Sequence, residues 1–264
     1  MDNRGLPRGA RATQAGDMKI TGNTMFIPGA TSGIGLGLAL RFHEAGNTVI
    51  IGGRRSGQLA EITAAHPGVE AVEIDVTDPA SIQRAVAAVT GRHPELNVLI
   101  AMAGIMLPED LHSGAFLPDA EATVATNLLG PLRLIAAFGP QLTARPDGVI
   151  MTVSSGLAFV PLPAAPTYSA CKAAIHAFTE SLRVQLADTS VQVLELVPPA
   201  VRTELFGQSE SEQAMPLEDF LSETMQLIET QPDAAEILVE RVGFLRDAVA
   251  NGSYPQVLAA LSGR

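Results

Sequence analysis

The 264-residue sequence predicts an α/β fold, a doubly wound parallel sheet with helices on both faces. Short β-type runs alternate with helix-type segments from Lys19 to Val197. Several of these runs are almost continuously apolar, which is typical of strands that helices cover on both faces. No internal repeat and no interdomain linker interrupts the alternation, so residues 18–264 are expected to form a single domain.

The alternation divides into expected strands and helices as follows. The first helix has an apolar face and ends at Gly46. A later helix begins at Asp78-Pro79 and carries Ile82, Val86 and Val89 at helical spacing. Right-handed crossovers through such helices connect parallel strands. The six expected strands are Thr24–Pro28, Thr48–Gly52, Glu70–Ile74, Asn97–Ala101, Gly148–Val153 and Val191–Val197.

The two ends of the chain differ from this pattern. Residues 1–17 lack apolar periodicity, so we interpret them as a disordered tail or a remnant of cloning, with Met18 as a candidate natural start. Residues 203–264 are expected to form a helical C-terminal part. Within it, Pro216–Thr230 and Pro232–Asn251 are the expected helices, and no final strand is expected.

Composition and charge exclude several classes of function. The chain has 28 acidic and 17 basic residues, a net charge of −11 and no basic cluster, which argues against binding nucleic acid or an anionic membrane. With 47% apolar residues the chain is not wholly disordered. Cys171 is the single cysteine and the five histidines are scattered, so no disulfide and no metal site are expected. No secretory leader or membrane span is recognised, and a reducing, cytoplasmic setting is expected.

A glycine-rich turn follows the first expected strand, in the segment Pro28-Gly29-Ala30-Thr31-Ser32-Gly33-Ile34-Gly35. Gly29 permits a tight turn, while Gly33 and Gly35 let the backbone approach a pyrophosphate and the helix pack closely on the sheet. The N–H groups and dipole at the helix N-terminus favour an anion. An ordinary connecting turn is the alternative. The sequence therefore predicts a dinucleotide site whose phosphates contact Gly29, Thr31, Ser32, Gly33, Ile34 and Gly35.

Two arginines follow the second expected strand. A site that prefers NAD usually places an acidic residue near this position to bind the ribose hydroxyls. Here Gly53 is followed by Arg54 and Arg55, and a guanidinium suits a 2′-phosphate. We therefore predict NADPH as the cofactor, with Arg54 the main contact and Arg55 either a secondary one or a solvated surface charge.

A second set of residues indicates proton transfer. The fifth expected strand leads to Ser155, and Tyr168 and Lys172 follow at a spacing that places both on one helical face. A nearby ammonium lowers the pKa of a phenol and lets it exchange a proton near neutral pH. A serine hydroxyl can donate a hydrogen bond to a substrate oxygen that gains charge. A Tyr-x-x-x-Lys pair alone is also compatible with an ordinary amphipathic helix.

Taken in order, these residues resemble the short-chain dehydrogenase/reductase family over about Lys19 to Phe206. The resemblance implies a Rossmann-type fold, and the glycine spacing is closer to the compact single-domain reductase branch than to the epimerase/dehydratase branch. The shared residues are Gly29, Gly33-Ile34-Gly35, Asp75-Val76 after the third strand, Ala103-Gly104 after the fourth, Asn127 in a helix, Ser155, Tyr168, Lys172, and Pro198 through Thr203.

The resemblance also implies a role for each catalytic residue. Tyr168 is the general acid in reduction and the general base in oxidation. Lys172 lowers the pKa of Tyr168 and holds the nicotinamide ribose. Ser155 polarises the carbonyl, and Asn127 maintains a water-linked proton relay near Lys172.

The remaining cofactor contacts implied by the resemblance lie after the strand ends. Asp75 and Val76 border the adenine, and Thr203 with the Val201 backbone borders the carboxamide. Ala103, Gly104 and Pro198 complete the expected contacts. The chain departs from the family pattern at Pro28, at Ala101-Met102, where two asparagines are usual, and at Pro198-Pro199-Ala200.

The leading interpretation is an NADPH-dependent carbonyl reductase (ketoreductase) or alcohol dehydrogenase. Two alternatives are a non-catalytic NADP-binding regulatory protein on the same fold and an NADP-dependent epimerase or dehydratase. An apolar pocket is expected to take a small hydrophobic ketone, aldehyde or secondary alcohol. Ser209–Phe220 is expected to be a mobile lid. The residues expected around the substrate are Met106, Leu107, Leu157, Phe159, Pro161, Pro163, Leu205 and Phe206.

Two expected helices, at Ala120–Gln141 and Tyr168–Leu186, carry much Ala, Leu and Phe on faces that we assign to the outside. Together with the missing final strand, this favours a homodimer formed through the two helices. The alternative is that these apolar residues all face the sheet.

Overall fold

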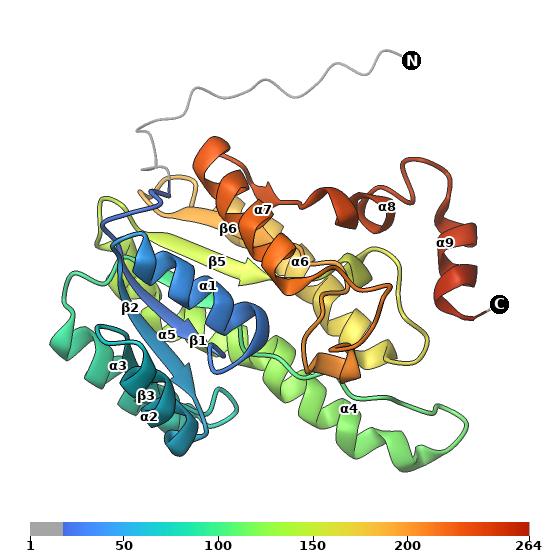
Figure 1. Cartoon of the computed structure of the whole chain (residues 1–264), viewed down its shortest axis with the longest axis horizontal. Coiled ribbons are helices and arrows are strands. Elements are labelled where there is room, and N and C mark those ends of the chain that lie inside the picture. The colour runs from blue at the N-terminus through green and yellow to red at the C-terminus, as the bar shows by residue number, and fades with distance from the viewer. Residues whose placement is uncertain (1–17, 264) are drawn as a thin grey trace.

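The computed structural model describes residues 18–263, so the expected tail at 1–17 lies outside the described residues. Seven parallel strands form one sheet in the order β3-β2-β1-β4-β5-β6-β7 (Figure 1). The predicted doubly wound α/β fold is therefore confirmed. The strands are β1 Thr24–Pro28, β2 Thr48–Gly53, β3 Glu70–Glu73, β4 Val98–Ala101, β5 Val149–Val153, β6 Gln192–Leu196 and β7 Glu236–Ile237.

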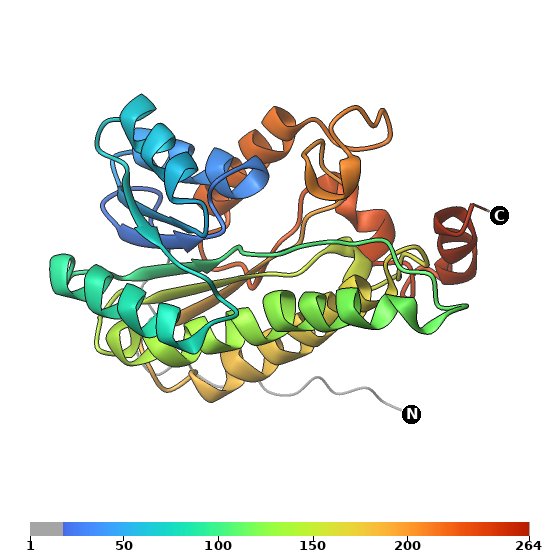
Figure 2. The same cartoon turned by 90° about the horizontal axis from the view of Figure 1, so that it is seen from below.

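The sheet is buried on both faces because its central strands carry apolar side chains that alternate between two helical layers. In β1, Met25 and Ile27 belong to one core and Phe26 to the other, and none of the three is exposed. Figure 2 shows the two layers on opposite sides of the sheet. One layer contains α1 Gly33–Glu44, α2 Ser56–Ala65 and α7 Leu217–Thr230, and the other contains α3 Pro79–Arg92, α5 Gly130–Thr143 and α6 Pro166–Gln185.

The expectation that no final strand exists is wrong. Strand β7 pairs in parallel with β6, and Glu195 and Val197 donate backbone hydrogen bonds to the Ala235 and Ile237 carbonyls. A two-residue strand that reads Glu-Ile is too short to give an apolar run or a period-2 pattern, which is why the sequence did not predict it.

The prediction of a helix over Pro232–Asn251 is also wrong. That range contains β7, a 3₁₀ turn at Glu240–Val242 and the four-residue helix α8 Gly243–Arg246. Helix α9, Tyr254–Leu261, was not predicted. The other expected C-terminal helix, Pro216–Thr230, is confirmed as α7.

A long helical segment runs beside α6, the helix that contains Tyr168 and Lys172. It begins with a 3₁₀ turn and α4 Leu117–Val124, passes through a π-helical turn, Ala125–Leu129, and continues as α5. By length and composition alone, the stretch Gly114–Thr143 is long and apolar enough to cross a membrane, which inspection of the sequence did not recognise. A core helix meets the same criteria, and Leu134 and Phe138 of α5 pack in the core without exposure.

Candidate active site

The glycine-rich turn brings three segments into close contact at the carboxyl end of β1. Gly29 has φ +93°, and a Cβ placed there would lie 2.5 Å from backbone atoms of Ala103. A Cβ at Gly35 would lie 2.5 Å from the Gly29 carbonyl oxygen. The backbone around the glycine-rich turn and the start of α1 is therefore packed so closely that only glycine fits at positions 29 and 35. Ser32, the N-cap of α1, accepts no hydrogen bond through its side chain.

One large cavity of about 610 Å³ lies along the carboxyl ends of the strands. Its walls bring together every residue that the sequence singled out for the cofactor, although these residues span 175 positions of the chain (29 to 203). The catalytic candidate Ser155 also lines it. The cofactor candidates in the walls are Gly29, Thr31, Ser32, Gly33, Ile34, Gly35, Arg54, Arg55, Asp75, Val76, Ala103, Gly104, Tyr168, Lys172, Pro198, Val201 and Thr203.

One end of this cavity is positively charged and solvent-accessible. Arg54 and Arg55 are both exposed, and Arg55 Nη2 donates to Thr31 Oγ1 at 3.3 Å. Asp75 lies beside them in the wall. Burial raises the pKa of Asp75, but hydrogen bonds from Thr77 and the charge of Arg54 outweigh it and hold this pKa below its usual value. Asp75 therefore carries a negative charge at neutral pH and attracts Arg54 to this end of the cavity.

Ser155, Tyr168 and Lys172 meet where β5 ends and α6 begins. All three are buried. Ser155 follows β5, and its Oγ accepts a hydrogen bond from the Leu157 N–H at 3.1 Å. Helix α6 begins at Pro166, a residue suited to the first helical turn, so Tyr168 lies in that turn and Lys172 one turn later. Lys172 Nζ donates to the Val153 carbonyl at 2.7 Å and lies 5.4 Å from the centre of the Tyr168 ring.

Burial moves the pKa values of this pair toward the neutral forms. It raises the pKa of Tyr168 to about 12, against a smaller lowering effect of the hydrogen bond with Ser155. Burial also lowers the pKa of Lys172 to about 8. The direction for Tyr168 is opposite to the lowering expected from the sequence, because removal of the phenolate from water outweighs the hydrogen bond with Ser155. At neutral pH the pair is a phenol beside an ammonium.

Asn127 lies next to this site and not in the cavity walls. It is fully buried in the π-helical turn, a feature that often marks functional sites. Its Oδ1 accepts from the Ile105 N–H at 2.8 Å and its Nδ2 donates to the Ile105 carbonyl at 2.7 Å. The side chain therefore holds the loop after β4, part of which lines the cavity. The proton-relay role expected for Asn127 stays a prediction.

The substrate end of the cavity differs from the set of residues expected there. Leu157 and Leu205 line it as expected. The other six expected residues do not. Met106 and Phe206 pack in one cluster with Tyr168, which does line the cavity, and Phe159 packs against His176 and Arg246. Met106, Leu107, Phe159, Pro161, Pro163 and Phe206 are absent from the cavity walls, as far as the described residues define them.

Four apolar residues line this end instead, and none of them belongs to a recognisable sequence motif. They come from the loop before α6 and from the C-terminal segment, whose short elements lack periodicity. The expected lid Ser209–Phe220 contributes Ser211, Gln213 and Ala214 to the walls. Its mobility stays a prediction. The four apolar residues are Leu162, Phe244, Leu245 and Leu261.

Comparison with known proteins gives a consistent result. Residues 23–214 match the family described as short chain dehydrogenase. An uncharacterized oxidoreductase of Bacillus subtilis (strain 168), DltE, is 40% identical over 237 residues, which cover 88% of this chain and 93% of the relative.

Solved structures are similar over most of the chain as well. A short chain dehydrogenase from Burkholderia cenocepacia J2315 in complex with NADP has a TM-score of 0.78 and 28% identity, covering 92% of this chain and 98% of that one. A serine dehydrogenase complexed with NADP⁺ has a TM-score of 0.74 and 25% identity, covering 81% and 92%.

Proposed function

Because the chain belongs to the short-chain dehydrogenase/reductase family, we propose that it transfers a hydride between NADP(H) and a carbonyl or alcohol substrate. One observation carries this proposal. The walls of a single cavity contain a glycine turn at one place and the buried set of Ser155, Tyr168 and Lys172 at another. Such an arrangement holds a dinucleotide and places proton-transferring groups beside it.

The residues of the cavity fit NADP. Gly29 and Gly35 let the turn pack against neighbouring backbone, since a Cβ at either position would lie 2.5 Å from a backbone atom, and the α1 N-terminus favours an anion. Arg54 and Arg55 at the exposed end suit a 2′-phosphate. Two structural relatives are NADP complexes, which supports the same choice. The bound cofactor supplies or accepts the hydride, and the protein supplies position and electrostatics.

In the reduction direction, the protein's task is to protonate the carbonyl oxygen. The neutral phenol of Tyr168 donates that proton, and the Ser155 hydroxyl donates a hydrogen bond to the same oxygen as it gains charge. The Lys172 ammonium beside the ring stabilises the phenolate that remains. In the oxidation direction, Tyr168 acts as its phenolate, which the Lys172 ammonium stabilises, and accepts the proton from the alcohol.

The substrate end supports an uncharged apolar substrate. Leu157, Leu162 and Phe244 are among the side chains that line it, and an apolar wall next to a few polar groups is usual for a small hydrophobic ligand. We therefore propose a small ketone or aldehyde in the reduction direction and a secondary or primary alcohol in the other.

A substrate panel tests the proposal. Purified protein is mixed with NADPH and a series of apolar ketones and aldehydes, and the loss of NADPH absorbance is followed. We expect oxidation with at least one apolar carbonyl compound, and slower oxidation of NADH. Binding of NADPH without turnover on the whole panel would contradict the proposal and indicate a regulatory protein.

A further inference from the structure

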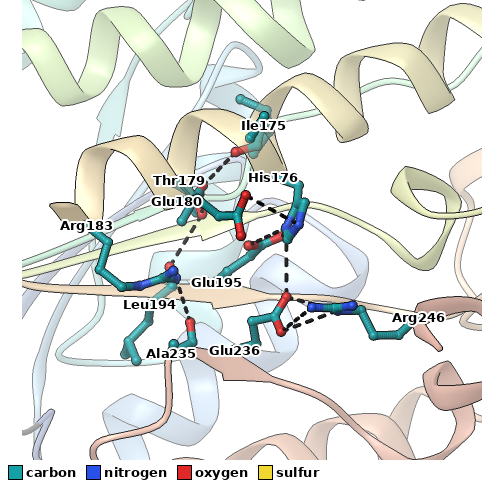
Figure 3. Close-up of polar contacts among 12 residues, drawn as sticks. Ile175, His176, Thr179, Glu180, Arg183, Leu194, Glu195, Ala235, Glu236 and Arg246 are labelled. Atoms are coloured by element: carbon teal, nitrogen blue, oxygen red, sulfur yellow. Dashed lines mark hydrogen bonds and ion pairs between the residues drawn. The ribbon is translucent and has the colours of Figure 1, made fainter. Parts of the chain in front are cut away.

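A group of charged side chains lies outside the cavity walls and connects the catalytic helix to the end of the sheet (Figure 3). His176 comes from α6, Glu195 from β6, Glu236 from β7 and Arg246 from α8. Both oxygens of Glu195 lie 3.0 Å from His176 Nδ1. Arg246 makes three hydrogen bonds of 2.9–3.3 Å to the two oxygens of Glu236. The proposed chemistry uses none of these four groups.

Glu195 is the unusual member because it is fully buried in the sheet. A carboxylate without partners at such a position carries the full desolvation penalty of a buried ion. His176 supplies a partner. A carboxylate only accepts hydrogen bonds, so Nδ1 of His176 must carry a proton and donate it. Glu236 and Arg246 form an ion pair, so their charges neutralise each other. The negative charge of Glu195 can therefore act on its other neighbours.

Lys172 lies on the same helix as His176. His176 lies one helical turn after Lys172, so both side chains point to the same side of α6. Thr152 faces Glu195 in the register of β5 and β6, and the next residue, Val153, provides the carbonyl that binds Lys172 Nζ. A hydrogen bond of 2.8 Å between the hydroxyls of Thr152 and Thr179 fixes α6 on this part of the sheet.

The electrostatics agree with this placement. Burial lowers the pKa of Lys172, and electrostatic interactions with Cys171 and, less strongly, with Glu195 oppose that effect. Burial raises the pKa of the Cys171 thiol, so this thiol is uncharged near neutral pH. Without Glu195, less of the lysine would be protonated near neutral pH.

We propose that Glu195, held by His176, is a positioning residue that keeps Lys172 charged and bound to the Val153 carbonyl. The inference rests on the proposed function, because Lys172 has its role only there. It adds a buried acidic group on β6 to the residues that tune the active site.

The other charged groups around Glu195 do not replace it. On α6, Glu180 lies 4.0 Å from His176 Nε2 but is exposed. On β7, Glu236 lies 3.8 Å from His176 Nδ1 and is bound to Arg246. Directly after α8, Asp247 interacts with Arg246. Glu195 is thus the fully buried acid of this group, and it lies on the strand next to β5, whose last residue, Val153, binds Lys172.

The same histidine and two glutamates lie within 4.8 Å of one another, a separation that a metal ion could bridge. A metal ion would have to bind next to the fixed positive charge of Arg246, which already bonds both oxygens of Glu236. We therefore favour an ion-pair network. Stoichiometric zinc or another divalent ion in the purified protein, found by elemental analysis, would overturn this interpretation.

The chain offers a direct measurement, because Lys19 and Lys172 are its only lysines. Protein labelled with ¹³C-lysine gives two sets of side-chain signals, and a pH titration reports the pKa of Lys172 without any need for turnover. We expect Lys172 to titrate near pH 8 in the wild type and at lower pH in Glu195→Gln. Glu180→Gln is the matched control, since it removes an exposed charge that also faces His176 and should leave the titration unchanged.

Two more variants separate charge from folding. Glu195→Asp keeps the negative charge, so the pKa of Lys172 should lie between those of the wild type and Glu195→Gln. His176 is partly exposed. His176→Ala removes the donor that holds Glu195, so it should also lower the pKa of Lys172. If Glu195→Gln does not fold, His176→Ala provides the test. A Lys172 titration identical to wild type in a folded Glu195→Gln or His176→Ala protein would overturn the proposal.

Activity gives a second and separate readout. The alkaline limb of the kcat/KM profile for carbonyl reduction should move to lower pH in Glu195→Gln, together with the titration of Lys172. A changed lysine titration in a protein that turns over no carbonyl compound would support the role of Glu195 and contradict the proposed function. Failure of the proposed role of Glu195 and failure of the proposed function therefore give different results.

Discussion

The surroundings of Tyr168 make it a proton donor at neutral pH. Burial raises the pKa of its hydroxyl to about 12, while the pKa of Lys172 falls to about 8. Lys172 therefore holds its charge below about pH 8 and loses it above. We expect the rate of carbonyl reduction to be flat through neutral pH and to fall as Lys172 loses its proton. A rate profile from pH 6 to pH 10 checks this, and a rise above pH 8 would contradict it.

Arg54 is predicted to determine the preference for NADPH. A charged hydrogen bond to a phosphate contributes about 1.5–3 kcal/mol, so Arg54→Ala should reduce the preference for NADPH over NADH about ten- to hundredfold. The ratio of kcat/KM values with the two cofactors measures it. Arg84→Ala is the control, because Arg84 is an exposed arginine that pairs with Asp78 and lies outside the cavity walls. An unchanged ratio in Arg54→Ala would show that another group binds the 2′-phosphate.

Among individual residues, those that belong to a sequence motif were predicted. Those that come together only in the folded chain were missed. Ser155, Tyr168 and Lys172 have a fixed spacing, and all three line the cavity. Phe244 belongs to a short helix without periodicity, so nothing in the sequence connected it to the substrate. Glu195 lies 19 residues from His176, and their contact depends on α6 crossing β6.

Among the elements, the first turn of α1 depends most strictly on a residue that lacks a side chain. Gly35→Ala would place a Cβ 2.5 Å from the Gly29 carbonyl oxygen, a contact with backbone that cannot move away freely. We expect a loss of about 1–3 kcal/mol in the free energy of unfolding, typical of overpacking, and weaker NADPH binding. Thermal unfolding and cofactor titration measure the two effects.

Gly91→Ala provides the matched control for Gly35→Ala. Gly91 is also helical, in α3, but it is exposed and a Cβ there meets no atom within 4 Å. Alanine favours a helix over glycine by about 0.5–1 kcal/mol, so this variant should be as stable as the wild type or slightly more stable. An equal loss of unfolding free energy in Gly35→Ala and Gly91→Ala would mean that the close packing of the turn is unimportant.

The strands show why most of the fold was predictable. The central strands β1, β4 and β5 are buried along their whole length because helices cover the sheet on both sides, and this produces apolar runs that are recognisable in the sequence. The other three predicted strands, β2, β3 and β6, mix apolar with polar residues. The observed ends of all six differ from the expected ones by at most one residue. Strand β7 lies at the edge of the sheet and consists of Glu236 and Ile237, so its existence depends on pairing with β6 and not on its own sequence.

For the whole molecule, a homodimer through Ala120–Gln141 and Tyr168–Leu186 stays a prediction. Most large apolar side chains on these helices face the sheet, as Leu134 and Phe138 do. Val184 on α6 is 77% exposed and is the side chain we expect in a contact between subunits. Light scattering after size exclusion should give the mass of a dimer for the wild type and of a monomer for Val184→Asp.

Val249→Asp is the control for the dimer. Val249 is 71% exposed, and it follows α8, outside both helices. This variant should keep the mass of the wild type. A monomeric wild type would reject the prediction.

The central claim is that Tyr168 transfers a proton to a substrate held beside NADPH, and Tyr168→Phe tests it most directly. The chain has two tyrosines, so Tyr254→Phe, in α9 and outside the cavity walls, is a matched control. Loss of a general acid lowers a rate by roughly 10²–10⁴-fold. We therefore predict that Tyr168→Phe binds NADPH like the wild type and reduces a carbonyl substrate at least about a hundredfold more slowly, while Tyr254→Phe is unaffected. Near-normal turnover by Tyr168→Phe would contradict the account.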